Sequence, residues 1–232
     1  MASLSLEGRP DKEGFFQSIS GGNRYLLDYL TEEILSHQSQ AVQDFLLQTS
    51  ILERLCPALC AALIDQACID PGKEELEHYQ GFLDILDRSN LFLSALDSQH
   101  TWYRYHRLFA DLLKTRLQTA YPALVPELHR RAAHWFAAHQ FPLEAFQHAS
   151  AIGDLEFATD LVSHNLQELI QRAEVATLTS WLATFPPQYL LERVELCLAK
   201  GWVNLYHIHF AEVEKWAQRA NALLQPDVSS QD

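Results

Sequence analysis

Apolar residues recur every three or four positions through most of this 232-residue chain, and the sequence contains only 8 glycines. This spacing places the apolar side chains on one face of an α-helix. With 48% hydrophobic residues, the chain is long enough to bury a substantial core, as one large domain or two small ones. The fold is therefore predicted to be mainly α-helical.

One short region departs from the helical period. Residues 91–96 and 101–105 are rich in β-prone side chains and flank a polar turn, a pattern that is typical of a β-hairpin. Helical patterns precede and follow the hairpin, at about residues 40–50, 57–68, 73–88 and 108–117. Three helices, a two-stranded wing and a closing helix predict a winged-helix domain at residues 41–120.

Residues 121–232 are predicted to form successive helix pairs. Pro126 and Pro142 suit the first turns of two helices, because a proline there forfeits no intrahelical hydrogen bond. Gly153 followed by Asp154 indicates a helix stop and then an N-cap. Residues 133–149 approximate a tetratricopeptide unit, although its period of about 34 residues is not held strictly downstream. The Pro186-Pro187 pair is predicted to be a turn.

The formal net charge is −13, and the acidic excess is spread along the chain. Nucleic-acid binding depends on Lys and Arg that neutralise phosphates, so no direct nucleic-acid partner is expected. The predicted third helix of the winged domain, residues 73–88, is itself acidic and would be repelled from a DNA groove. No stretch approaches the ~20 apolar residues of a membrane span. We expect a soluble, cytoplasmic protein with no membrane partner.

Metal and catalytic motifs are missing from the sequence. Cys56 and Cys60 stand four apart, but no second close pair follows at zinc-site spacing, so these two, Cys68 and Cys197 are expected to be buried or reduced thiols. The histidines with short spacings are expected in the core, on the surface or at helix ends: His129, His134, His139, His207 and His209. No phosphate-binding loop and no hydrolase motif occurs, and no enzyme is predicted.

Four segments, in this order and spacing, resemble the MalT-type regulators, which are signal-transduction ATPases of the STAND class with a LuxR-type DNA-binding tail. They are residues 24–33 (RYLLDYLTEE), 45–56 (FLLQTSILERLC), 103–113 (YRYHRLFADLL) and 128–133 (LHRRAA). The resemblance extends over nearly the whole chain.

The resemblance implies a domain order. Residues 1–40 would be a helical lid remnant, 41–120 the winged helix, and 121–232 a helical arm with the start of a tetratricopeptide-like sensor array. In the family, a nucleotide-binding domain precedes these parts, so that domain is an expected partner within the same protein. ATP or ADP is expected in the full-length protein, and no cofactor in this segment.

His106 is the residue that the resemblance singles out. In related signalling ATPases the matching histidine faces the β-phosphate of the nucleotide and holds the closed, ADP-bound state, and an imidazole N–H can donate to phosphate. Many relatives have His or Pro at the position of Arg107, so this chain adds a charge there. The alternative is that His106 caps its helix or packs on Tyr103 or Trp102.

The basic cluster has two interpretations. Arg104, Arg107, Lys114 and Arg116 could contact phosphate or DNA, or they could form a solvated face that makes ion pairs with the acidic remainder. With His106, Arg104 and Arg107 are predicted to meet nucleotide only when the nucleotide-binding domain is present. Aromatic residues further along could line a ligand surface or fill the core between repeats: Trp181, Phe185, Trp202, Phe210 and Trp216.

Two functions remain open at this point. The first is a non-catalytic regulatory segment that relays nucleotide state and the binding of an inducer or protein partner on the helical array. The second is a freestanding helical-repeat adaptor that binds a protein or peptide. The sequence does not identify the inducer or the residues that couple the parts.

Overall fold

The computed structural model describes residues 35, 36, 38–65, 71–88 and 92–225. Among these residues, a single two-stranded antiparallel sheet and many helices confirm the mainly α-helical prediction. The chain divides into two compact units, one of residues up to Leu55 with Leu83–Pro122, the other of Cys56–Phe82 with Ala123–Asp232. Cys68 and most of the predicted lid lie outside the described residues.

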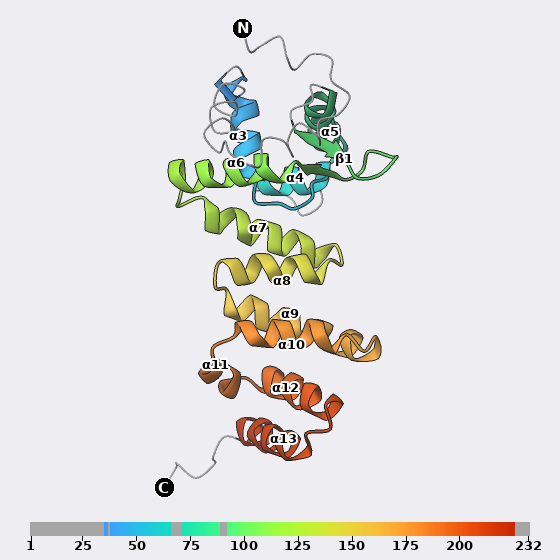
Figure 1. Ribbon diagram of the computed structural model, residues 1–232, viewed down its shortest axis with the longest axis vertical. Coiled ribbons are helices and arrows are strands. Elements are labelled where there is room, and N and C mark those ends of the chain that lie inside the picture. Colours follow the sequence, from blue (N-terminus) through green and yellow to red (C-terminus); the bar gives the residue numbers. More distant parts are fainter. Residues whose placement is uncertain (1–34, 37, 66–70, 89–91, 226–232) are drawn as a thin grey trace, which may run out of the picture. The chain divides into compact units, whose positions relative to one another are not determined.

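In the first unit, helices α3 (Gln40–Thr49) and α6 (Arg107–Ala120) pack against each other. Helix α3 starts at Ser39, whose hydroxyl accepts a hydrogen bond from a backbone N–H of the first turn. The hairpin consists of β1 (Leu93–Ala95) and β2 (Tyr103–Tyr105), and β2 leads directly into α6 (Figure 1). The hairpin prediction is therefore confirmed, with shorter strands.

The period of two explains which strand residues face the core. Tyr103 and Tyr105 are buried, whereas Arg104 between them is exposed. Leu93 pairs with Tyr105 across the hairpin. Leu55 adds a bridge on the other side of β2, where its backbone N–H and C=O both bond to Tyr103 at 2.8 Å. The strand β2 is thus held from both edges.

Two tyrosine hydroxyls fix the hairpin to neighbouring helices. The Tyr105 hydroxyl lies 2.7 Å from the Thr49 hydroxyl at the end of α3, in a buried hydrogen bond. The Tyr103 hydroxyl donates to a carboxylate oxygen of Asp84 at 3.0 Å. Asp84 belongs to α5 (Lys73–Arg88), the predicted third helix of the winged domain. Polar groups that find partners in this way fix the position of a strand, because the hydrogen bonds offset the cost of removing the groups from water.

The wing turn is organised by one carboxylate. Asp97 accepts hydrogen bonds from the backbone N–H groups of Gln99, Thr101 and Trp102, and from the Thr101 hydroxyl at 2.6 Å. The hydroxyl bond and then the backbone bonds of Thr101 lower the pKa of the Asp97 carboxyl to about 2. This charge-assisted turn sets the path of the chain into β2.

The second unit is a series of helices that stack along the chain, as the yellow to red ribbons of Figure 1 show. In sequence order its complete helices are α4 (Pro57–Ile64), α7 (Val125–Ala138), α8 (Pro142–Ala151), α9 (Leu155–Gln171), α10 (Val175–Thr184), α11 (Pro187–Glu192), α12 (Val194–Tyr206) and α13 (Phe210–Leu224). None of the described helices combines the length and apolar character that crossing a bilayer requires.

The predicted helix starts and the predicted stop are confirmed. Pro57, Pro126 and Pro142 each stand in the first turn of a helix. Gly153 has φ +69, and Asp154 accepts the N–H of the third residue of α9. These positions follow from local chemistry, because proline fixes φ and aspartate offers an acceptor to orphan N–H groups.

The predicted turn at Pro186-Pro187 lies at the break between α10 and α11, but only Pro186 stands outside a helix. Pro186 has extended backbone and acts as the N-cap, and Pro187 opens the short helix α11. A proline pair ends the preceding helix, yet its second member is also favoured at the first helical position. The sequence indicates that the proline pair ends a helix, but it does not show that Pro187 begins the next one.

Helix ends in the second unit repeat one geometry. Gln140, Ala173 and Ile208 all have positive φ, at 68, 55 and 60°, and each follows the C-cap residue of α7, α9 or α12. At each helix end, the backbone N–H groups of the positive-φ residue and of the next residue donate hydrogen bonds to carbonyls of the last helical turn, which is the Schellman arrangement. These three caps lie 33 and 35 residues apart, and the same arrangement also occurs at Gly153 after α8.

Small residues let the paired helices approach closely. Ala132 and Ala133 on α7 and Ala145 and Ala149 on α8 are fully buried, and the two helices pack directly on one another. Further along, the ring of Phe146 stacks on Trp181 at 4.4 Å. The core of this unit is therefore continuous from one helix pair to the next.

Candidate functional site

The junction between β2 and α6 positions His106. Its backbone N–H donates to the carbonyl of Phe92 at 2.6 Å, and its own carbonyl accepts from Ala110 at 3.0 Å. Phe92 has φ 54, which is strained for a bulky residue, and its ring packs on Phe109 at 4.9 Å. His106 is thus held by its backbone from both sides, with a half-buried side chain.

His106 is the N-cap residue of α6, but its side chain makes no capping hydrogen bond. The capping interpretation of the sequence is therefore wrong. The first N–H groups of a helix lack intrahelical acceptors, and they carry the positive end of the helix dipole. The start of α6 consequently favours a negative group, and phosphates bind at such helix starts.

The basic side chains lie on the strand and helix that meet at His106. Arg104 is exposed on the outer face of β2, and Arg107 is exposed in the first turn of α6. Further along α6, Arg116 is exposed and Lys114 is half-buried. Within the described part of the chain, none of the four makes an ion pair. For the acidic residues outside that part, the ion-pair interpretation stays a prediction. These four side chains place local positive charge in an acidic protein.

Arg131 joins two helices that are distant in sequence. Its guanidinium donates to the carbonyl of Leu63 at the end of α4 at 2.6 Å, and to Glu127 within α7 at 3.0 Å. The side chain is only 15% exposed, and it lowers the pKa of the Glu127 carboxyl through that hydrogen bond. Arg131 thereby ties a helix of the predicted winged domain to the first helix of the arm.

The histidines do not converge on one point. His129 bonds to His148 between their Nδ1 atoms at 2.8 Å, His134 packs on Phe157, and His139 stacks on Trp135. Among the described residues, no group of three or more His, Cys, Asp or Glu is placed to hold a metal ion. Cys56, Cys60 and Cys197 are buried and take part in no disulfide, and burial raises the pKa of the Cys60 thiol.

The aromatic residues divide between core and surface. Trp181 is 2% and Phe185 is 4% exposed, which confirms the core interpretation for both. Trp202 and Trp216 are half-buried, and Phe210 is 65% exposed at the α12–α13 turn. The core interpretation is therefore wrong for Phe210.

Comparison with known proteins identifies the segment that contains His106. Residues 31–125 match the family described as MalT winged helix domain. These residues are similar to a MalT-type winged helix. The segment contains α3 to α6 and the hairpin, and it includes both His106 and the basic surface.

Similarity extends beyond the MalT-type winged helix into the arm. The chain is 34% identical over 205 residues to the serine/threonine-protein kinase PknK of Mycobacterium tuberculosis, covering 88% of this chain and 18% of the relative. It is 32% identical over 196 residues to the HTH-type transcriptional regulator MalT of Klebsiella pneumoniae, covering 84% and 21%. MalT of Yersinia enterocolitica is 31% identical over 201 residues, with 87% and 21% covered. The resemblance to MalT-type regulators is confirmed, and the chain spans about a fifth of these relatives' length.

The predicted site residues His106, Arg104 and Arg107 thus lie around one strand-to-helix junction of the MalT-type winged helix. The role assigned to them remains a prediction. Sequence reasoning missed Arg131 as a connection between helices. Residues 128–133 (LHRRAA) contribute to the resemblance to MalT-type regulators, but nothing in this segment indicates a hydrogen bond from Arg131 to Leu63.

Proposed function

We propose that this chain is a non-catalytic regulatory segment of an ATP-dependent transcriptional activator in the cytoplasm. In this proposal it relays nucleotide state, and the binding of an inducer or protein partner, to a DNA-binding domain elsewhere in the protein. The observation that carries the proposal is the position of His106 at the start of α6 in a MalT-type winged helix, with Arg104 and Arg107 beside it.

The chemistry of that junction suits phosphate. The N-terminus of α6 presents backbone N–H groups, an imidazole N–H can donate a hydrogen bond, and two guanidinium groups add positive charge. In the proposal, the nucleotide-binding domain of the same protein brings ADP to His106. The contact to phosphate stabilises the closed state, and its loss releases the winged helix.

The relay needs a stiff connection between the winged helix and the arm. Arg131 supplies one, because its guanidinium bridges the end of α4 and the start of α7 while it is largely shielded from water. A movement of α4 would therefore carry α7 with it. In the proposal, the partner signal travels through this bond in the opposite direction.

The acidic surface of α5 supports an internal role for the winged helix. Glu74 and Glu77 are exposed, and the first turn carries Glu74 and Glu75. A helix with this charge is repelled by DNA phosphates. A segment similar to this one also occurs in PknK, which is named a kinase and not a transcriptional regulator. The proposed role of the segment is therefore to receive a signal, and other parts of the protein produce the output.

The proposal is tested with His106→Ala in the protein encoded by the complete reading frame. Loss of one hydrogen bond to a charged phosphate should weaken ADP binding by roughly tenfold or more, and basal transcription without inducer should rise. Equilibrium dialysis with labelled ADP and an in vitro transcription assay measure the two effects.

The matched control is His100→Ala, which removes a histidine from the exposed wing turn of the same hairpin. It should leave both measurements unchanged. Equal ADP affinity and equal basal output for the His106 variant and the unaltered protein would overturn the proposal.

A freestanding helical-repeat adaptor is the second candidate, and a groove along α9 favours it. The reading frame upstream of Met1 separates the candidates. An in-frame nucleotide-binding domain supports the regulatory segment, and an independent ribosome-binding site before Met1 supports the adaptor.

A further inference from the structure

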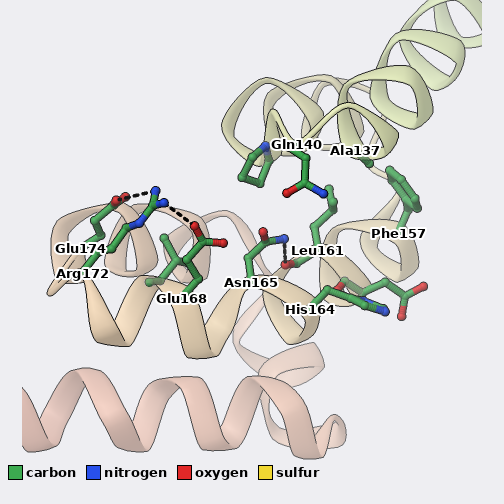
Figure 2. A pocket seen from close by; sticks show the side chains of 12 residues that line it. Ala137, Gln140, Phe157, Leu161, His164, Asn165, Glu168, Arg172 and Glu174 are labelled. Carbon is green, nitrogen blue, oxygen red and sulfur yellow. Dashed lines mark hydrogen bonds and ion pairs between the residues drawn. The ribbon is translucent and has the colours of Figure 1, made fainter.

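A groove of about 610 Å³ runs along one face of α9, with the α7–α8 turn on one side and the start of α10 at one end (Figure 2). All of its residues belong to the second unit. It is lined by Ala137, Gln140, Pro142, Phe157, Asp160, Leu161, His164, Asn165, Glu168, Leu169, Arg172 and Glu174.

The helical period separates an apolar floor from a polar rim. Leu161 and Leu169 are buried and Phe157 is half-buried, and these residues form the apolar part of the lining. Asp160 and Glu168 are exposed and lie within a turn of that stripe. The groove therefore offers an apolar contact surface with charge at its edge.

Two polar side chains of the groove each donate a hydrogen bond to a backbone carbonyl of α9. His164 donates from Nδ1 to the carbonyl of Asp160 at 2.7 Å, which leaves its Nε2 as an acceptor when the ring is neutral. Asn165 donates from Nδ2 to the carbonyl of Leu161 at 2.7 Å, so its Oδ1 remains an acceptor. Figure 2 shows both side chains on the same face of α9.

The charges of the groove are predominantly negative. Asp160, Glu168 and Glu174 supply three carboxylates against the single guanidinium of Arg172. That guanidinium is engaged by Glu168 at 2.6 Å and by Glu174 at 4.0 Å. Within the described residues the Asp160 carboxylate makes no ion pair. The three carboxylates outnumber the one guanidinium, so the groove has a net negative charge.

The walls of the groove are preformed. Gln140 and Ala173 hold the Schellman caps at the ends of α7 and α9, and backbone hydrogen bonds fix both turns. A preformed groove loses little conformational entropy when it is filled. Its shape and chemistry favour a ligand that brings both donors and apolar side chains.

We propose that this groove binds a short segment of a protein partner that carries arginine or lysine beside leucine-like residues. The cationic side chains meet Asp160 and the Glu168 end of the groove, and the apolar ones cover Leu161 and Phe157. The proposal rests on the part of the proposed function in which the helical array takes a partner. It adds the position of the site and the chemistry of that partner.

The test is selection of random 12-residue peptides, displayed on phage, against the 232-residue chain without nucleotide. Peptides with a clear excess of Arg and Lys should be enriched. The most enriched peptide is then labelled, and its Kd is measured by fluorescence anisotropy at two salt concentrations. Affinity should fall at higher salt, because the contacts are partly electrostatic.

Two variants locate the site. Asp160→Asn removes the carboxylate without an ion pair and should weaken peptide binding about fivefold, the equivalent of about 1 kcal/mol. Asn165→Lys places a cation in the groove and should weaken binding at least about tenfold. Glu195→Gln, which removes an exposed carboxylate from α12, makes the same charge change outside the groove and should have no effect.

Enrichment of no peptide or of acidic peptides would overturn the proposal, as would unchanged binding by both groove variants. An equal loss in the Glu195 variant would do the same, because it would show a non-specific charge effect. The assay contains no nucleotide and leaves His106 unaltered. Its failure is therefore separate from a failure of the nucleotide relay.

Discussion

Replacing Arg131 by methionine should destabilise the second unit, because this one side chain connects α4 to α7. Methionine retains much of the apolar stem, so the change removes the charge and its hydrogen bonds. The variant leaves the carbonyl of Leu63, a fully buried residue, without the guanidinium at 2.6 Å, and it removes the partner of Glu127 at 3.0 Å.

The magnitude follows from burial. A hydrogen bond from a charged donor contributes about 1.5–3 kcal/mol, and the loss of a partner for a buried carbonyl falls in the same range. For a side chain that is only 15% exposed, we expect a loss of about 2 kcal/mol in the free energy of unfolding. In a chain of this size that corresponds to a decrease in Tm of roughly 4–8 °C.

Arg130→Met is the matched control. Arg130 is the preceding residue and pairs with the same Glu127, but its side chain is 50% exposed. A surface ion pair of this kind contributes between zero and about 1 kcal/mol, so the control should lose about 0.5 kcal/mol or less.

Urea unfolding followed by far-ultraviolet circular dichroism measures both variants against the unaltered chain. The expected outcome is a fall in midpoint for Arg131→Met that is several times the fall for Arg130→Met, with similar slopes. Equal losses for the two variants would refute the reasoning. They would mean that the bond to Leu63 contributes nothing beyond the ion pair with Glu127.

Two further predictions concern backbone conformation and charge. Ala173→Gly should stabilise the chain by roughly 0.5–1 kcal/mol, because glycine adopts φ 55 without the strain of a Cβ. The control Ala217→Gly, on the exposed face of α13, should destabilise the chain by a similar amount. Thermal unfolding measures both variants, and a change of the same sign in both would contradict the cap argument. The Asp97 carboxyl should titrate at about pH 2, below its ordinary 3.8, so its stabilising effect is complete above that ordinary value and is lost as the pH falls through about 2. Carbon-13 NMR titration measures this, and a midpoint near 3.8 would show that the wing turn is not formed as described.

Much of the fold could be predicted because its signals are local. Pro142 and Asp154 mark helix starts through their own backbone and side-chain chemistry. The alternation of Tyr103, Arg104 and Tyr105 indicates a half-buried strand. The acidic excess of α5 can be predicted from the residues of that one helix. Each of these features involves residues within a few positions of one another.

The candidate site could be predicted only in part. The sequence indicated the positions of His106, Arg104 and Arg107 through a resemblance, and the structure adds that they surround a helix start whose N-cap side chain makes no capping bond. Sequence reasoning left ion pairs open for this basic surface. Whether an exposed arginine meets a carboxylate depends on which elements pack nearby, and periodicity does not contain that information.

The sequence by itself determined the helices, the hairpin, the acidic character and the resemblance to MalT-type regulators, because periodicity, caps and composition act over short distances. The tertiary structure alone decided that Arg131 bonds to Leu63, 68 positions away, and that the α7–α8 turn meets α9 to form a groove. It also decided that Gln140, Ala173 and Ile208 adopt left-handed backbone conformations. A glycine at these positions would have indicated a helix cap in the sequence, but none is present. Packing of the following helix outweighs the local cost at these turns, and no local rule contains that balance.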